Sequence, residues 1–320
     1  MSRDSDFCHI PVLFSESMAA LKIRQDGVYI DCTAGGGGHS LGILRRLGPE
    51  GLLLSMDKDE EAIRHCRFLR EKEERKDCWR IEKADFAFFA DLLTDAGIER
   101  ADGILADFGV SSSQLDTPRR GFSYSKDGPL DMRMDGSSPI TAAAVINTYD
   151  ESDLVRIFRR YGEEKYAGRI AGAIVGRRST RPFLTTGELA ETILSALPAR
   201  ARNEDQHPAR RVFMATRIEV NQELASIDTL LKSAPEYLRD GGRMAVISFH
   251  SLEDRRVKEI FRELEVPCVC PRDFPVCVCG RTAKGQVITK RAITASEDEI
   301  ERNGRARTAR LRVFERREHV

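Results

Sequence analysis

Apolar runs alternate with amphipathic helical patterns along the first hundred residues. The apolar runs lie at residues 28–31, 51–57, 79–82 and 103–106. Between them, residues 39–47 and about 59–75 place apolar side chains at the spacing of a helix face. Strands that are apolar throughout and alternate with helices predict a parallel β-sheet that is covered on both faces.

The pattern changes after residue 112. Residues 113 to about 212 contain several helical stretches and no convincing strand, and they open with a long polar loop at 117–138. A loop of that length without structure of its own is more often functional than idle. Residues 213–231 are then predicted to be helical, and the apolar run 243–248 resumes the sheet. We therefore predict an α/β core made of 1–112 and 213–320, with a helical substrate-recognition domain inserted at 113–212.

The last predicted strand covers residues 309–314. Its apolar residues alternate with Arg310 and Arg312, a period of two that predicts a half-exposed strand with the arginines on its solvent face. A short helix before it is predicted to begin at Ser296 and to end at Asn303.

Composition and charge limit the classes of partner. The chain has 320 residues, of which 41% are hydrophobic and 32% charged, and it lacks the long apolar run of a membrane span and the pattern of a signal peptide. We therefore expect a cytoplasmic protein that does not contact membranes. The 51 basic and 51 acidic residues exclude a globally basic nucleic-acid binder. Basic residues nevertheless concentrate in the middle and at the end, which permits a polyanionic partner, although solvated helix faces account for this as simply.

Four consecutive glycines, residues 35–38, stand between the first predicted strand and the first helix. Such a loop lets the backbone approach a ligand, and Asp57 at the end of the second strand is placed to accept hydrogen bonds from ribose hydroxyls. Together they predict a cofactor that contains a nucleoside. Ser40 stands where the dinucleotide fingerprint has its third glycine, which favours S-adenosylmethionine over a nicotinamide dinucleotide.

Asp107 is the first candidate for chemistry. It ends the fourth predicted strand, next to the first strand, where open α/β sheets bind their ligands. A carboxylate there can hold a substrate amine and orient its lone pair, but capping of the turn at 109–113 accounts for it equally well. His39 and His250 stand close to other predicted strand ends, where helix capping competes with a functional role.

Two Cys-x-Cys pairs, separated by six residues, lie in a proline-rich segment. They are formed by Cys268, Cys270, Cys277 and Cys279. Four thiols suffice for a tetrahedral zinc, but zinc pairs normally have two to four residues between ligands. Reduced structural cysteines are therefore favoured over zinc, and no catalytic metal is expected.

Longer strings, taken together, resemble one family from about residue 9 to 316. They are His9–Leu13, Asp31–Ser40, Asp107–Ser112, Arg120–Ser123, Asp127–Asp135, Tyr161–Glu164, His207–Ala209 and Ser248–Asp254. The chain resembles the bacterial 16S rRNA (cytosine-N4)-methyltransferases of the RsmH/MraW type. The resemblance implies a class I S-adenosylmethionine-dependent methyltransferase fold, which is α/β and Rossmann-like, with an inserted helical domain. It also implies methyl transfer to the exocyclic N4 amine of a cytidine in the decoding centre of 16S rRNA.

The resemblance implies site residues as well. The family's cofactor contacts correspond to Gly37, Gly38, His39, Asp57, Phe86, Asp107 and Gln114, with Asp107 also at the reaction centre. For RNA we select Arg133, His207, Arg210 and Arg211. Phe122 or Tyr124 could stack on bases, and Arg133 could instead pair with Asp131 or Asp135. The expected partner is 16S rRNA within the small ribosomal subunit.

Three other functions remain open on the residues alone. The first is a methyltransferase that acts on another nucleobase or on a protein amide. The second is an RNA-binding assembly factor without catalysis, which the intact glycine loop with Asp57 and Asp107 disfavours. The third is a nicotinamide oxidoreductase, which cofactor titration would separate from a methyltransferase.

Overall fold

The computed structural model describes residues 11–202, 207–271, 276 and 278–318, and the chain divides into two compact units. Met1–Gly109 and Leu224–Val320 form one, called here the sheet unit, and Val110–Glu223 form the other, called the helical unit. An α/β core interrupted by a helical insertion, as the sequence predicts, is therefore confirmed. The α/β class follows from the sheet described next.

A seven-stranded sheet organises the sheet unit, in the order β3-β2-β1-β4-β5-β7-β6. Its parallel strands are β1 (Val28–Asp31), β2 (Leu52–Asp57), β3 (Trp79–Lys83), β4 (Ala101–Asp107) and β5 (Leu238–Ser248). The antiparallel strands β6 (Gly285–Val287) and β7 (Arg310–Arg316) complete it at one side. Since β1 lies between β2 and β4, the strand order reverses beside β1, which is where ligands bind in such sheets.

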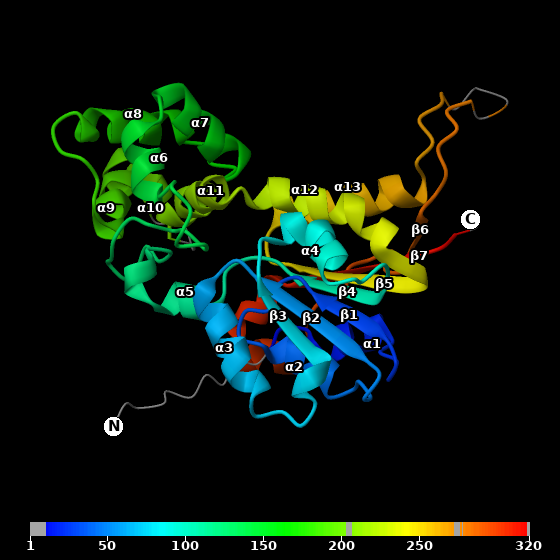
Figure 1. The fold of residues 1–320 in the computed structure, drawn as a ribbon. Helices are drawn as coiled ribbons and strands as arrows, with labels where there is room; N and C mark the ends of the chain where they lie inside the picture. The colour runs from blue at the N-terminus through cyan, green and yellow to red at the C-terminus, as the bar shows by residue number, and fades with distance from the viewer. Residues whose placement is uncertain (1–10, 203–206, 272–275, 277, 319–320) are drawn as a thin grey trace. The chain divides into compact units, whose positions relative to one another are not determined.

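Helices cover both faces of this sheet (Figure 1). On one face lie α1 (Phe14–Leu21), α2 (Gly38–Leu44) and α3 (Glu60–Arg70); on the other lie α4 (Phe89–Asp95), α12 (Glu223–Ser233) and α13 (Ser251–Glu265). Successive strand residues enter opposite cores, since Leu53 faces the first set and Leu54 the second. Burial on both faces is why the strands are apolar throughout.

The prediction of a half-exposed last strand is wrong. In β7 the residues from Leu311 to Glu315 are buried, and Arg312 is only 8% exposed. Its guanidinium donates hydrogen bonds of 2.7 and 3.1 Å to Asp254 of α13, and Arg310 donates a third of 3.0 Å. The strand is buried because β7 lies between β5 and β6 and beneath helices, so Arg312 is accommodated by a buried carboxylate instead of by water.

The helical unit packs its helices around a core of its own. Its elements are α5 (Ser112–Asp116), η3 (Pro118–Arg120), α6 (Ala142–Thr148), α7 (Glu151–Arg160), α8 (Ala167–Arg178), α9 (Thr186–Ala196), α10 (Ala199–Arg202) and α11 (Ala209–Asn221). The helical unit runs from Val110 to Glu223, and the insertion predicted from the sequence runs from 113 to 212. Helix α11 belongs to this unit because its Val212 and Phe213 are buried in the core with Leu154.

The single helix predicted over 213–231 is two helices. It is interrupted at Gln222, whose φ of 52° places it in the left-handed region and ends α11. Helix α12 then begins at Glu223. The interruption falls at the boundary between the two units.

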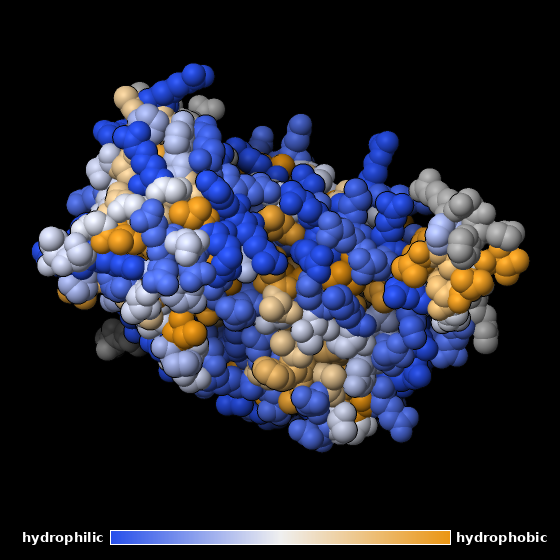
Figure 2. All heavy atoms as spheres, turned by 90° about the horizontal axis from the view of Figure 1, so that it is seen from above, coloured by the Kyte–Doolittle hydropathy of each residue, from blue (hydrophilic) through white to orange (hydrophobic). Residues whose placement is uncertain are grey.

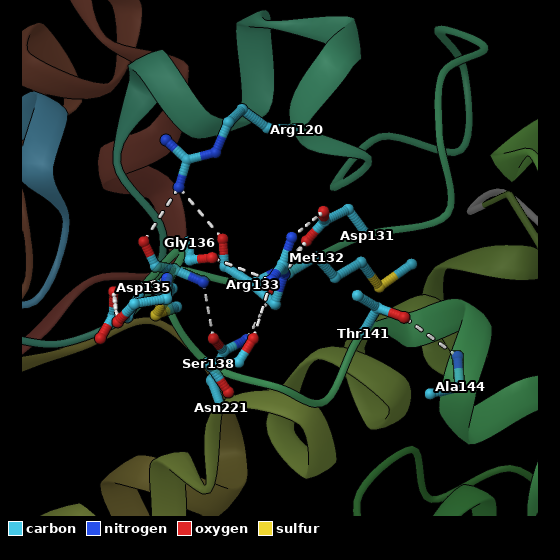
Figure 3. A network of polar contacts seen from close by, with 12 residues as sticks. Arg120, Asp131, Met132, Arg133, Asp135, Gly136, Ser138, Thr141, Ala144 and Asn221 are labelled. Atoms are coloured by element: carbon cyan, nitrogen blue, oxygen red, sulfur yellow. Dashed lines mark hydrogen bonds and ion pairs between the residues drawn. The ribbon is translucent and has the colours of Figure 1, made fainter.

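The polar loop 117–138 is tied down rather than structureless (Figure 3). Asn221 of α11 donates to the carbonyl of Met132 at 2.8 Å and accepts from the amide of Met134 at 2.7 Å. Arg120 donates to the carbonyls of Arg133 and Met134 at 3.1 and 3.0 Å. Side chains and backbone together therefore fix a segment whose regular secondary structure is limited to η3.

None of the helices in the described part of the chain is long and apolar enough to cross a membrane.

Candidate active site

Three carboxylates end neighbouring strands of the sheet. Asp31 ends β1, Asp57 ends β2 and Asp107 ends β4. Because these strands are parallel and β1 pairs with both neighbours, the three side chains lie at the same edge of the sheet. The edge is that of the strand-order reversal, so acidic groups gather where a ligand is expected.

The backbone conformation and the packing of the loop 35–38 require glycine at two of its positions. Gly37 has a φ of 77° and its amide donates to the Ala34 carbonyl at 2.7 Å, closing a tight turn before α2. A Cβ on Gly38 would lie 2.3 Å from Cγ of Pro11, far inside contact distance. At Gly37 the backbone conformation opposes a side chain and a Cβ would also lie 2.7 Å from Cδ1 of Leu69, while at Gly38 close packing alone opposes one.

Asp57 is held by backbone amides. Its Oδ2 accepts from Gly35 at 2.8 Å and its Oδ1 accepts from Asp59 at 2.8 Å. Burial raises the pKa of Asp57 to about 6, although both hydrogen bonds act to lower it. Each carboxylate oxygen can accept a further bond, so the group can receive two donors such as vicinal hydroxyls.

A buried chain of hydrogen bonds supports the loop from below. The indole of Trp79 donates to Ser55 at 2.8 Å, Ser55 and Ser40 share a bond of 2.8 Å, and Ser40 donates to Asp31 at 2.6 Å. The backbone amide of Thr33 also donates to Asp31, at 3.1 Å. Ser40 thus replaces the third glycine of the fingerprint with a polar contact to β1.

Sequence reasoning missed this role of Asp31 and Ser40. The signal was present, because Ser40 is a hydroxyl on the apolar side of a helix that follows a strand ending in a carboxylate.

Asp107 and His39 form the polar pair closest to the predicted chemistry. The Nε2 atom of His39 lies 3.6 Å from Oδ2 of Asp107, which is an ion-pair distance and too long for a hydrogen bond. Burial acts to lower the pKa of His39, but Asp107 and Asp31 outweigh it, so the pKa is raised. The backbone amide of Asp107 donates to the hydroxyl of Thr33 at 2.7 Å, which joins the ends of β4 and β1.

Buried polar atoms of this pair lack partners. Oδ1 of Asp107 and both ring nitrogens of His39 make no hydrogen bond with the described residues. Buried polar groups are normally satisfied, and exceptions often mark a place for a ligand or water. The turn at 109–113 has its own cap, since the Ser111 hydroxyl accepts from the Gln114 amide, so capping does not account for Asp107.

Phe86 lies immediately after β3, in η2 (Phe86–Phe88). Asp85 fixes the turn by accepting from the amide of Ala87 at 2.9 Å. The Phe86 ring is half-buried and its centroid lies 5.5 Å from that of Phe108, which follows Asp107. An aromatic surface therefore borders the carboxyl ends of these strands.

The remaining predicted cofactor contact, Gln114, belongs to the helical unit. It is 5% exposed, and its Oε1 accepts from the Ser111 amide at 3.0 Å, completing a capping box for α5. Its position is thus determined locally by the start of that helix. His250 also caps a helix, α13, which is the simpler of the two roles that its sequence position allows, and its Nε2 lies 3.0 Å from Glu253.

Arg133 is engaged within the loop 117–138 (Figure 3). Two of its nitrogens donate to the two oxygens of Asp131, both at 2.8 Å, and Nη1 donates to the carbonyls of Gly136 and Ser138. Of the roles that the sequence allows, pairing with Asp131 is therefore present. With 24% of the side chain exposed, Arg133 has a clear role in fixing the loop.

The other predicted RNA contacts lie at or near the start of α11. Exposed His207 stacks on Tyr124 with ring centroids 4.6 Å apart. Exposed Arg210 forms no side-chain hydrogen bond or ion pair with described residues, while Arg211 lies 3.9 Å from buried Glu164. Phe122 is 6% exposed within the core, so it offers no stacking surface, in contrast to half-buried Tyr124.

The sulfur atoms of Cys268, Cys270 and Cys279 all lie within 4.8 Å of one another. The fourth cysteine of the motif, Cys277, lies outside the described residues.

Comparison with known proteins gives a consistent assignment. The model of the MraW methylase family matches residues 6–317. "Ribosomal RNA small subunit methyltransferase H" of Carboxydothermus hydrogenoformans is 50% identical over 311 residues, covering 97% of this chain and 98% of that protein. Proteins with the same name from Symbiobacterium thermophilum and Clostridium botulinum are 49% and 47% identical, each over 96% of this chain and over 96% and 98% of their own lengths.

Proposed function

Because the chain belongs to the MraW methylase family, we propose that it methylates the exocyclic N4 amine of a cytidine in the decoding centre of 16S rRNA, with S-adenosylmethionine as donor. The names of its relatives support small-subunit rRNA as the substrate class. We expect it to act on rRNA within the small ribosomal subunit, and therefore in the cytoplasm. The N4 position rests on the sequence resemblance and on the acceptor geometry of Asp107.

The sheet edge fits S-adenosylmethionine. Asp57 would accept its ribose hydroxyls, Phe86 would border the adenine, and the backbone of Gly37 and Gly38 would contact the ligand. In the helical unit, Gln114 is proposed as a further contact. When bound, the cofactor supplies an electrophilic methyl group on its sulfonium.

The observation that carries the catalytic proposal is the unsatisfied Oδ1 of Asp107. The amine of cytosine is a poor nucleophile because its lone pair is delocalised into the ring. A carboxylate oxygen that accepts a hydrogen bond from this amine would orient the lone pair for in-line attack. His39 would hold the other oxygen of Asp107 through their ion pair and is proposed to contact the cofactor as well.

The target base must leave its stack to reach a site of this kind. We assign substrate recognition to the helical unit, with His207, Arg210 and Arg211 at or near the start of α11 as its RNA contacts. Stacked His207 and Tyr124 offer an aromatic surface, while exposed Arg210 offers a charge for phosphate. Arg133 is proposed to act on RNA chiefly through the loop that it holds in place, with its exposed edge toward solvent.

The experiment is a methyl-transfer assay with labelled S-adenosylmethionine and small ribosomal subunits that lack this modification, followed by nucleoside analysis. Label in N4-methylcytidine is expected. Label in another nucleoside would overturn the proposed target, and no label despite cofactor binding would favour the non-catalytic assembly factor.

Two variants separate the role of Asp107 from a general effect of lost charge. Asp107→Ala should lower turnover at least about 100-fold while cofactor affinity falls only modestly. Exposed Asp95→Asn, at the end of α4, is the matched control and should keep full turnover. Near-normal turnover of Asp107→Ala would remove Asp107 from the chemistry.

RNA contact is tested by the double variant Arg210→Ala, Arg211→Ala. Its RNA affinity should fall and the slope of log affinity against log salt should decrease by about one to two. Arg67→Ala with Arg75→Ala, both exposed and in the sheet unit, is the control for the same loss of charge. Unchanged RNA affinity and an unchanged salt slope in the α11 variant would show that these arginines are solvent-exposed residues of the helix that do not contact RNA.

A further inference from the structure

The described valines in the segment between α13 and β6 have little apolar packing around them. The segment leaves the end of α13 and returns to β6 as two neighbouring stretches that project from the sheet unit (Figure 1). Four of its valines are largely exposed, at 60, 63, 70 and 72%: Val266, Val269, Val276 and Val278. Figure 2 shows hydrophobic side chains at the surface on the right, the side on which this segment lies in Figure 1. A segment with its apolar side chains in water needs another source of order.

Three thiols converge within this segment. The sulfur atoms of Cys268, Cys270 and Cys279 lie within 4.8 Å of one another. Thiolates bound to one tetrahedral zinc at about 2.3 Å lie roughly 3.7 Å apart, so small side-chain rotations bring these sulfurs to bonding positions. The two stretches contribute unequally to the described set, with Cys268 and Cys270 from one and Cys279 from the other.

The Cys-x-Cys spacing, unusual for zinc, has a geometric reason here. Along an extended chain, side chains alternate between two sides, so residues two apart lie on the same side. Burial follows this alternation at Cys270 and Cys279, which are half-buried while the adjacent Val269 and Val278 are exposed; Cys268 is exposed. Two facing extended stretches can thus direct their cysteines inward without the turn that a longer spacing would need.

A backbone contact also joins the two stretches at Cys270. The amide of Val278 donates to Sγ of Cys270 at 3.4 Å, across the two stretches. Amide donors of this kind stabilise metal-bound sulfur and orient it. Where the segment joins the sheet unit, the amide of Lys284 donates to the Leu264 carbonyl at 2.8 Å, so the two ends of the segment lie close together.

We propose that Cys268, Cys270 and Cys279 bind a structural Zn²⁺ that fixes this segment. Soft thiolate ligands select zinc over magnesium or calcium, and metal binding releases the thiol protons, so the site weakens as the pH falls. The cluster has no part in the proposed methyl transfer, and its test is independent of that activity.

Metal content of the full-length chain, purified without a polyhistidine tag, provides the test. Elemental analysis should find about one zinc per chain after gel filtration. Cys268→Ser, Cys270→Ser and Cys279→Ser should each lower the zinc retained against a competing chelator at least about tenfold, as the removal of one ligand of a small set predicts. The control is Cys78→Ser, a half-buried cysteine elsewhere in the sheet unit, which should keep its zinc.

Two further measurements separate a zinc site from a group of thiols that bind no metal. Cobalt added to metal-free protein should give thiolate charge-transfer absorption in the wild type and Cys78→Ser, and not in the cluster variants. Cleavage by trypsin after exposed Arg281 should be at least about tenfold slower with zinc than with chelator. Unfolding monitored by Trp79 should be unchanged in all variants, which shows that metal loss is local.

Purified wild type that holds almost no zinc and does not bind added zinc or cobalt would overturn the proposal. So would zinc that the cluster variants retain as fully as the wild type, because the metal would then lie elsewhere. A disulfide between cluster cysteines in freshly purified protein that does not take up zinc after reduction would equally refute it.

Discussion

Ser40→Ala should destabilise the sheet unit strongly, although it removes a single oxygen atom. Ser40 and Asp31 are both fully buried, and their hydrogen bond is 2.6 Å long. A hydrogen bond to a charged group contributes about 1.5–3 kcal/mol, and leaving the Ser55 hydroxyl without an acceptor costs about 1 kcal/mol more. We therefore expect a loss of about 3 kcal/mol, or roughly 6–12 °C in Tm for a unit of this size.

The loss should depend on pH. Burial raises the pKa of Asp31, and the bond from Ser40 acts to lower it, so the variant raises that pKa further. A carboxyl whose pKa is higher in the folded state than in the unfolded state stabilises the fold at low pH, and this contribution disappears as the pH rises through the folded pKa. Ser40→Ala should therefore be less destabilising at about pH 5 than at about pH 8.

Urea unfolding followed by tryptophan fluorescence measures the loss of stability and its dependence on pH. Trp79 is the one tryptophan of the chain, and it donates to Ser55 in the same network. Ser233→Ala is the matched control, because its hydroxyl donates only to backbone carbonyls of its own helix α12, and it should cost less than about 0.5 kcal/mol. If Ser40→Ala were no more destabilising than this control, or equally so at both pH values, the network would not support the loop.

Three more predictions concern the same unit. Gly38→Ala should weaken S-adenosylmethionine binding at least about tenfold in calorimetry, because its Cβ would meet Pro11 at 2.3 Å and displace the loop. With the pKa of Asp57 raised to about 6, cofactor affinity should fall about tenfold from pH 8 to about pH 5, since ribose hydroxyls need the ionised carboxylate. Arg312→Met should cost about 3 kcal/mol in urea unfolding by leaving Asp254 with Arg310 alone, the low end of the range for a broken buried pair.

Matched variants make each of these decisive. Gly168→Ala has open space around its Cβ and should bind cofactor normally. Asp57→Asn should remove the part of the pH dependence that is due to Asp57; a profile that it leaves unchanged would contradict that assignment. Arg302→Met, an exposed arginine of α14 (Glu297–Arg302), should be nearly neutral, and equal stability of the two arginine variants would show that the buried pair contributes little.

Much of the fold follows from local pattern. The strands at 28–31 and 51–57 are recognisable because burial on both faces demands continuous apolar residues. The glycine loop is recognisable because glycine adopts the left-handed conformation at Gly37 at no steric cost. Asp57 and Asp107 could be placed at one edge of the sheet since parallel strands bring their carboxyl ends together. Each of these inferences needs only residues that are close in the sequence and one rule of sheet construction.

The remainder depended on contacts between distant residues. From the sequence alone, Arg312 is predicted to face solvent; in the fold it binds Asp254, which is 58 positions away. Ser40 stands where the dinucleotide fingerprint has a glycine, and its role follows only from its hydrogen bonds to Asp31 and Ser55. Helix α11 joins the helical unit because Val212 and Phe213 find their core there. Local periodicity reports which face of an element is buried, but the partner that satisfies a buried polar group is chosen by the packing of the whole unit. Only the tertiary structure could therefore decide these roles.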